Sequence, residues 1–189
     1  MSKDHFDYVI IGAGLSGIGA ACHFSKKCPK KTYAILEGRD VIGGTWEIFK
    51  YPGIRSDSDM FTLGYNFKPW TSSKFLADGP SILNYITEAG KEHNVLEKIR
   101  YNSWVKALSW DSDEALWTIT YDNNKTGKTG QVTCNVITVG TGIFDYSGGY
   151  EPDFAGREDF KGPVVHPQSW PEDLDYKGKK VIMVGDRKS

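Results

Sequence analysis

Residues 7–21 read DYVIIGAGLSGIGAA, and residues 32–37 read TYAILE. The first stretch has the apolar, β-branched composition of a buried strand up to Ile11, and three glycines follow at Gly12, Gly14 and Gly17. Apolar residues then recur at helical spacing from Leu15, and residues 32–37 have the composition of a second strand. The pattern predicts an α/β fold that begins with a Rossmann-like unit of strand, glycine turn, helix and strand.

The glycine spacing is G-x-G-x-x-G, in the strand-to-helix context that this motif needs to bind phosphate. Gly12 permits the tight turn, Gly14 lets the backbone approach a pyrophosphate, and Gly17 lets the helix pack closely on the strand. Ser16, in the same helical turn, is a further candidate ligand. Glu37 ends the second strand, where a carboxylate binds ribose hydroxyls and repels a 2′-phosphate. These residues predict FAD or NAD rather than NADP, and the alternative is a glycine-rich turn without a ligand.

Composition narrows the possible functions. The chain has 189 residues and a formal net charge of −1, so it has no basic field that would attract nucleic acid or an anionic membrane. Its three cysteines lack C-x-x-C spacing, which predicts neither a disulfide framework nor a metal site and fits a cytoplasmic location. Neither an apolar leader nor a stretch of about 20 apolar residues is present, so we expect no secretion signal and no membrane span.

A loop motif follows the second strand. Residues 43–46 read GGTW, residues 51–53 read YPG, and Asp57 comes shortly after. Composition alone leaves a surface loop with a packed tryptophan and a ligand-binding loop about equally acceptable. This order resembles the flavin-side motif of Baeyer–Villiger monooxygenases and flavin-containing monooxygenases, and residues 51–65 are similar to the ethionamide-activating and alkane-degrading branch. The resemblance implies that Gly44, Thr45 and Trp46 lie near FAD and that Asp57 lies beside the flavin ring and nicotinamide.

A second match to the same group lies at residues 160–171, FKGPVVHPQSWP. They fit the pattern F-x-G-x-x-x-H-x-x-x-W-P, which is the fingerprint of type I Baeyer–Villiger enzymes. A single histidine in a proline-rich loop is more often a structural residue than a catalyst. The resemblance implies that His166 couples domains or gates closure rather than transferring a proton to the substrate.

In the middle of the chain, the spacing of apolar residues predicts a packing helix over residues 81–92. Short runs rich in aromatic and β-branched residues follow at residues 104–110, 116–121 and 130–134 and are typical of strands. We interpret the runs as an antiparallel β-meander of about residues 99–135. The resemblance to flavoproteins with two dinucleotide-binding domains implies that this meander is inserted into a three-layer Rossmann-like fold. Residues 136–140 are expected to return as a buried strand that ends in a Thr-Gly turn. The resemblance implies that Val105, on the first meander strand, meets the adenine.

We expect three regions: an FAD-binding domain over residues 1–143, a linker over 144–176, and the first strand of a second nucleotide-binding domain over 177–189. A second glycine motif should follow Gly185, but Arg187 stands where its second glycine belongs. The sequence therefore predicts a chain truncated before the NADPH domain. Such a chain would expose apolar surface through which it could self-associate.

The resemblance implies the FAD-binding portion of an NADPH- and O₂-dependent monooxygenase. Its full-length relatives would carry out Baeyer–Villiger oxidation of ketones, or oxygenation of sulfides and amines, through a C4a-peroxyflavin. NADPH is implied for the full-length enzyme only, and this chain is expected to be incomplete and inactive alone. Two alternatives remain: a non-catalytic FAD-binding module and a minimal NAD-dependent dehydrogenase.

Overall fold

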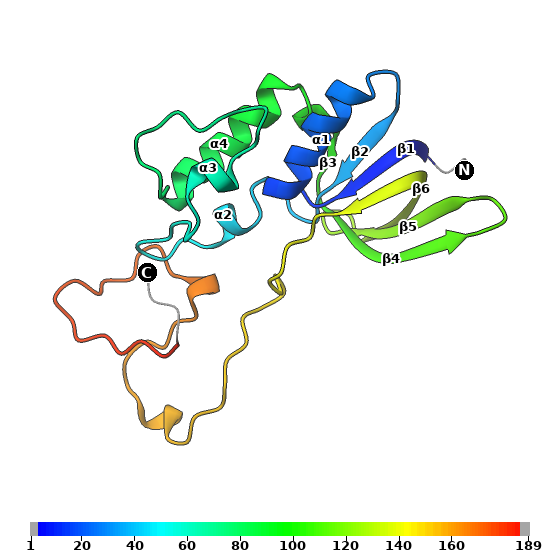
Figure 1. The fold of residues 1–189 in the computed structure, drawn as a ribbon. Helices are drawn as coiled ribbons and strands as arrows, with labels where there is room; N and C mark the ends of the chain where they lie inside the picture. The colour runs from blue at the N-terminus through cyan, green and yellow to red at the C-terminus, as the bar shows by residue number, and fades with distance from the viewer. Residues whose placement is uncertain (1–3, 186–189) are drawn as a thin grey trace.

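The computed structural model describes residues 4–185. Its centre is a six-stranded sheet with the strand order β3-β2-β1-β6-β5-β4 (Figure 1). Four strands pair in parallel, and the last three along the chain pair antiparallel. The strands are β1 (Asp4–Ile11), β2 (Tyr33–Leu36), β3 (Ile99–Arg100), β4 (Ser103–Asp111), β5 (Leu116–Asn123) and β6 (Lys128–Val139).

Two long helices cover one face of the parallel strands, and short helical turns lie in the connections. The glycine turn is followed by α1 as predicted, and α1 packs against α4. The helices are α1 (Leu15–Lys27), α2 (Thr45–Ile48), α3 (Met60–Leu63) and α4 (Gly79–Glu92), with 3₁₀ turns η1 (Leu96–Lys98), η2 (Arg157–Asp159) and η3 (Pro167–Ser169).

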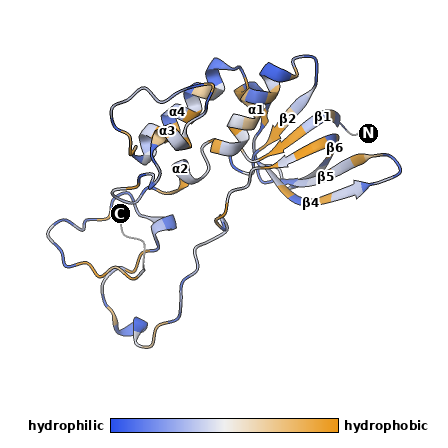
Figure 2. Cartoon of the chain, viewed as in Figure 1, coloured by the Kyte–Doolittle hydropathy of each residue, from blue (hydrophilic) through white to orange (hydrophobic). Residues whose placement is uncertain are grey.

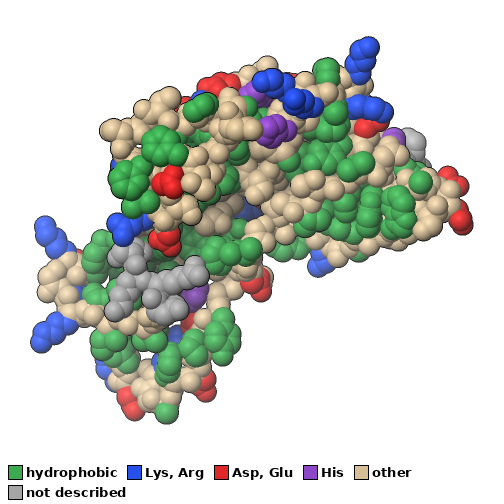
Figure 3. Space-filling model, in the orientation of Figure 1, with side chains coloured by type: hydrophobic (Ala, Val, Ile, Leu, Met, Phe, Trp, Pro, Cys, Tyr) green, Lys and Arg blue, Asp and Glu red, His purple; other side chains and the backbone are tan. Residues whose placement is uncertain are grey.

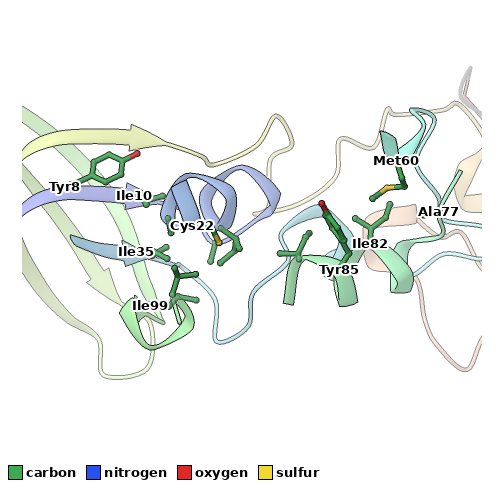
Figure 4. Close-up of a cluster of buried hydrophobic side chains, with 14 residues drawn as sticks. Tyr8, Ile10, Cys22, Ile35, Met60, Ala77, Ile82, Tyr85 and Ile99 are labelled. Atoms are coloured by element: carbon green, nitrogen blue, oxygen red, sulfur yellow. The ribbon is translucent and has the colours of Figure 1, made fainter. Parts of the chain in front are cut away.

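The main core lies between the parallel strands and the two long helices (Figure 4). Ile10 of β1, Ile35 of β2, Ile18 of α1 and Ile82 of α4 are completely buried there. Full burial of such a side chain contributes about 1.5–3 kcal/mol to folding. Figure 2 shows the matching pattern, with hydrophobic residues along the central strands and hydrophilic residues at the hairpin tip. The helices are therefore fixed over the sheet by the apolar faces that the sequence predicts.

The β-meander forms the third layer. β3 and β4 are at opposite ends of the strand order, although only two residues separate them in the chain, so the sheet curls back on itself. The Ser103 amide of β4 accordingly donates to the Glu37 carbonyl, at 2.7 Å, just beyond β2. A second buried cluster joins Val9 and Leu36 of the parallel strands to Ile119 of β5. The predicted three-layer Rossmann-like fold with an inserted meander is confirmed.

Helix α4 shows why its boundaries were predictable. The structure starts it at Gly79, two residues before the predicted start, with Pro80 in the first turn. The Asp78 carboxylate caps the helix by accepting the Ser81 amide at 2.9 Å. Its buried positions include Ile82 and Ile86, the expected apolar face.

Two details of the predicted sheet are wrong. Residues 99–100 pair in parallel with β2 instead of beginning the meander. The runs at 130–134 and 136–140 form one strand, β6, because β1 pairs with it from Val132 to Val139. This strand is also only partly buried: Val136 is 55% and Val139 57% exposed, since no described element covers these two side chains.

The chain after β6, residues 140–185, is called here the tail segment. It runs away from the sheet and folds back towards α2, with short 3₁₀ turns and no strand among its described residues (Figure 1). Hydrophobic side chains gather on it in Figure 3. Residues 181–184 are strongly exposed and pair with no described strand, so the strand expected from residue 177 is not formed. Residues 186–189, where the second glycine motif was expected, lie outside the described residues.

Candidate functional site

A cavity of about 570 Å³ lies at the carboxyl ends of β1, β2 and β6. The strand order reverses here, since β2 lies on one side of β1 and β6 on the other. Open α/β sheets bind their ligands at such a switch point. The lining includes residues 11, 12, 14–16, 36–39, 43–46, 48, 103–105 and 140–146.

The glycine turn forms the floor of this cavity. Gly12 has a φ of +97°, and a Cβ there would lie 2.5 Å from the Gly140 carbonyl oxygen. A Cβ at Gly17 would lie 1.8 Å from the Gly12 carbonyl oxygen. Gly17 therefore allows α1 to pack on the turn, as predicted, and does not itself line the cavity.

The first turn of α1 suits a pyrophosphate. α1 is 13 residues long, and its N-cap is Gly14. Among the described residues no side chain caps this end, and its first turn contains no acid. The amides of the first helical turn have no intrahelical acceptor, and the positive end of the helix dipole adds to their attraction for an anion.

Glu37 lies on the cavity wall in a fixed position. One carboxylate oxygen accepts the Ala13 amide at 2.7 Å, and the other accepts the Arg39 amide at 3.0 Å. A carboxylate oxygen has a second lone pair, so both oxygens retain acceptor capacity for ribose hydroxyls. The fold therefore holds a negative charge where the sequence predicts one.

The GGTW loop lies directly against the glycine turn. The Gly43 amide donates to the Ala13 carbonyl at 3.0 Å. A Cβ at Gly44 would lie 3.3 Å from the Gly14 Cα, so the two backbones touch. The loop continues into the single-turn α2, which begins at Thr45. An ion pair between Arg39 and Glu47 ties the same loop to the end of β2.

The meander supplies the far wall. Val105 of β4 lines the cavity beside Trp104. Val105 borders an irregularity in the pairing of β4 with β5. The Trp104 ring packs against Gly38, where a Cβ would lie 2.6 Å from the ring. The first meander strand thus reaches the cavity at the residue that the resemblance implies.

Eight of the residues predicted for the cofactor line one cavity: Gly12, Gly14, Ser16, Glu37, Gly44, Thr45, Trp46 and Val105. Three predicted site residues do not line it: Asp57, His166 and Gly17, which instead fixes the packing of α1. Asp57 is exposed in the loop before α3. His166 precedes η3, where its Nδ1 accepts the Gln168 amide at 3.1 Å.

The sequence patterns miss two parts of the lining. Arg39 follows Glu37 without a motif of its own. The tail residues 143–146 lie in a segment without regular spacing, and all four line the cavity as the chain leaves β6. In this part of the chain, only the Thr141-Gly142 turn indicates from sequence that the chain passes the edge of the sheet where the cavity lies.

We also searched the described residues for a metal site and for a membrane-spanning helix. Residues 4–185 contain no group of three or more His, Cys, Asp or Glu side chains arranged to hold a metal ion. Within the same range, none of the helices combines the length and the apolar character that crossing a membrane requires.

Comparison with known proteins gives consistent matches. Residues 10–73 match the NAD(P)-binding Rossmann-like domain, and residues 63–189 match the family described as flavin-binding monooxygenase-like. The chain is 54% identical over 182 residues to the FAD-containing monooxygenase EthA of Mycolicibacterium smegmatis. The match covers 96% of this chain and 37% of that relative, so the chain spans little more than a third of its length.

Solved structures agree with this result. A steroid monooxygenase bound to NADP superposes with a TM-score of 0.76 and 28% identity, over 92% of this chain and 33% of that one. The OTEMO complex with FAD and NADP gives a TM-score of 0.74 and 30% identity, over 93% of this chain and 33% of that one.

Proposed function

Because this chain belongs to the flavin-binding monooxygenase-like family, we propose that its cavity binds FAD. The pyrophosphate would lie over Gly12 and Gly14, against the first turn of α1, with Ser16 beside it. Glu37 would bind the adenosine ribose, and Val105 would meet the adenine. The GGTW loop, with Gly44, Thr45 and Trp46, would run along the flavin half.

The observation that carries this proposal is the convergence of three separate sequence motifs on one cavity. The glycine turn, the acid that ends β2 and the GGTW loop are brought together by the fold, and the meander closes the far wall. The uncapped first turn of α1 offers its amides to an anion, and the glycines let the protein backbone approach the pyrophosphate of the ligand. A glycine-rich turn without a ligand does not account for the acid and the loop beside it.

We propose the activity of the whole protein from its family. It would be a cytoplasmic, NADPH- and O₂-dependent monooxygenase that acts on a small ketone, sulfide or amine. Bound FAD would supply the redox chemistry, while the residues of this chain bind and orient it. Asp57 would face the nicotinamide, and His166 would couple the flavin domain to the rest of the enzyme. The exposed apolar residues 181–184 favour self-association of the isolated chain.

The test is a titration of the purified chain with FAD, followed by flavin fluorescence, with Glu37→Gln as the variant. The substitution removes the charge that strengthens hydrogen bonds to ribose hydroxyls, so we expect FAD to bind about tenfold more weakly. Glu114→Gln is the matched control because Glu114 is exposed in the β4–β5 turn, away from the cavity.

The same titration separates the alternatives. Saturable binding of one FAD per chain, with little affinity for NAD, supports the proposal. Tight binding of NAD without FAD would favour a dehydrogenase. Catalysis is a separate question, because a non-catalytic FAD-binding module would give the same titration but no NADPH-dependent oxygen consumption in the full-length protein.

A further inference from the structure

Tyr146 brings a second hydroxyl group to the mouth of the cavity. Its hydroxyl oxygen lies 3.4 Å from the Thr45 hydroxyl, and both residues line the cavity. Thr45 comes from the start of α2, whereas Tyr146 comes from the tail segment, about a hundred residues later. Two neighbouring hydroxyls can both donate to one acceptor.

The glycines around Tyr146 leave room for its hydroxyl. A Cβ at Gly142 would lie 2.7 Å from this oxygen, and one at Gly44 would lie 3.9 Å from it. Gly44 in turn touches Gly14, the glycine expected to approach the pyrophosphate. The Tyr146 hydroxyl is therefore beside the place where the cofactor phosphates are proposed to lie.

The residues on both sides of Tyr146 are held. The Asp145 carboxylate accepts the Ser147 amide at 2.9 Å and the Ser147 hydroxyl at 2.6 Å. These hydrogen bonds lower the pKa of Asp145. On the N-terminal side, the Phe144 ring also packs edge-on against Phe49 with ring centroids 5.1 Å apart. The short turn therefore presents Tyr146 in a defined position.

The same turn is linked to the fingerprint sequence. The Gln168 side-chain amide donates to the Asp145 carbonyl at 2.8 Å. The Gln168 backbone amide donates to His166 Nδ1 at 3.1 Å. A continuous path thus runs from His166 through Gln168 and Asp145 to Tyr146.

We propose that Tyr146 is a cofactor-contacting residue whose hydroxyl, together with that of Thr45, donates hydrogen bonds to the phosphates of the bound dinucleotide. Gln168 is a positioning residue that holds the Tyr146 turn, and His166 acts on the cavity through Gln168. The inference rests on the proposed FAD site. It assigns a role in cofactor binding to His166 and Gln168 of the fingerprint sequence, residues 160–171.

The test compares Tyr146→Phe, which keeps the ring and removes the hydroxyl, with Tyr150→Phe. Tyr150 lies in the same segment, is 86% exposed and does not line the cavity. A hydrogen bond to a charged phosphate is worth about a tenfold change in affinity. We expect FAD to bind Tyr146→Phe about tenfold more weakly, and Tyr150→Phe as tightly as the unmutated chain.

A phosphate-specific readout excludes a general loosening of the fold. Competition with ADP and with adenosine, which lacks phosphate, gives the ratio of the two affinities. The affinity for ADP divided by the affinity for adenosine should fall about tenfold in Tyr146→Phe, because only ADP offers the phosphate acceptor. An unchanged ratio together with equal weakening of both ligands would overturn the assignment.

Gln168→Ala tests the positioning role. The variant should weaken FAD binding by itself, and in combination with Tyr146→Phe it should add little, because both act through one hydroxyl. Additive losses would contradict this role. FAD binding to Tyr146→Phe at the unmutated affinity would overturn the inference and leave the FAD site standing, whereas no FAD binding by the unmutated chain would overturn both.

Discussion

Replacement of Gly17 by alanine tests the contact that fixes α1 on the glycine turn. A Cβ at this position would lie 1.8 Å from the Gly12 carbonyl oxygen and 2.9 Å from its carbonyl carbon. Real Cβ atoms essentially never approach another non-bonded heavy atom within 3.0 Å. The Cβ would lie only 1.8 Å from the carbonyl oxygen, so α1 must move away from the turn by about 1.2 Å. The obstacle is backbone, which has no alternative rotamer.

Two opposing terms set the size of the effect. Alanine has a better helix propensity than glycine by about 1 kcal/mol in a helix interior. Overpacking costs about 1–3 kcal/mol, and a backbone clash belongs at the upper end of that range. We therefore expect Gly17→Ala to lower the free energy of unfolding by about 2 kcal/mol, or the Tm by about 4–8 °C for a chain of this size.

Thermal unfolding followed by far-UV circular dichroism measures this change. Gly148→Ala is the control, because a Cβ there meets nothing within 4 Å and the glycine does not have a positive φ. Its Tm should equal that of the unmutated chain. A Gly17→Ala variant as stable as the control, with FAD affinity unchanged, would show that α1 does not pack on the turn as described.

Further predictions concern a helix cap and the thiols. Asp78→Ala should cost about 1 kcal/mol in urea unfolding and Asp78→Asn much less, since asparagine caps a helix nearly as well. Lys74 and Ser81 lower the Asp78 pKa, so this stabilisation is present above its unfolded pKa of about 3.9 and is lost as the pH falls through the lower folded pKa. Equal losses in both variants would contradict the cap. Burial raises the pKa of Cys22 and Cys134 to about 11, so a thiol reagent should label one cysteine fast in the folded chain, and three fast thiols would contradict the packing.

The first half of the fold was predictable because its signals are local. The run to Ile11, the three glycines and the helical spacing after Leu15 each depend on neighbouring residues only. The start of α4 is similar, since Asp78 and Pro80 are typical of a helix start. These elements need no knowledge of distant contacts.

The errors come from long-range pairing. The sequence predicts separate strands at residues 130–134 and 136–140, and only the pairing with β1 joins them into the single strand β6. Residues 99–100 were assigned to the meander because a two-residue strand is defined by its partner, β2. The glycine turn, Glu37 and the GGTW loop are predictable for the same local reasons as the fold. Tyr146 lies in the irregular segment just after β6, and no sequence spacing indicates that its side chain lines the cavity.

A crystal structure of this chain with FAD tests the central claim most directly. We predict the pyrophosphate within hydrogen-bonding distance of the amides in the first turn of α1, and the adenosine ribose at the Glu37 carboxylate. FAD bound elsewhere, for example in the second cavity between α1 and β6 that Tyr8 and Phe24 line, would contradict the account.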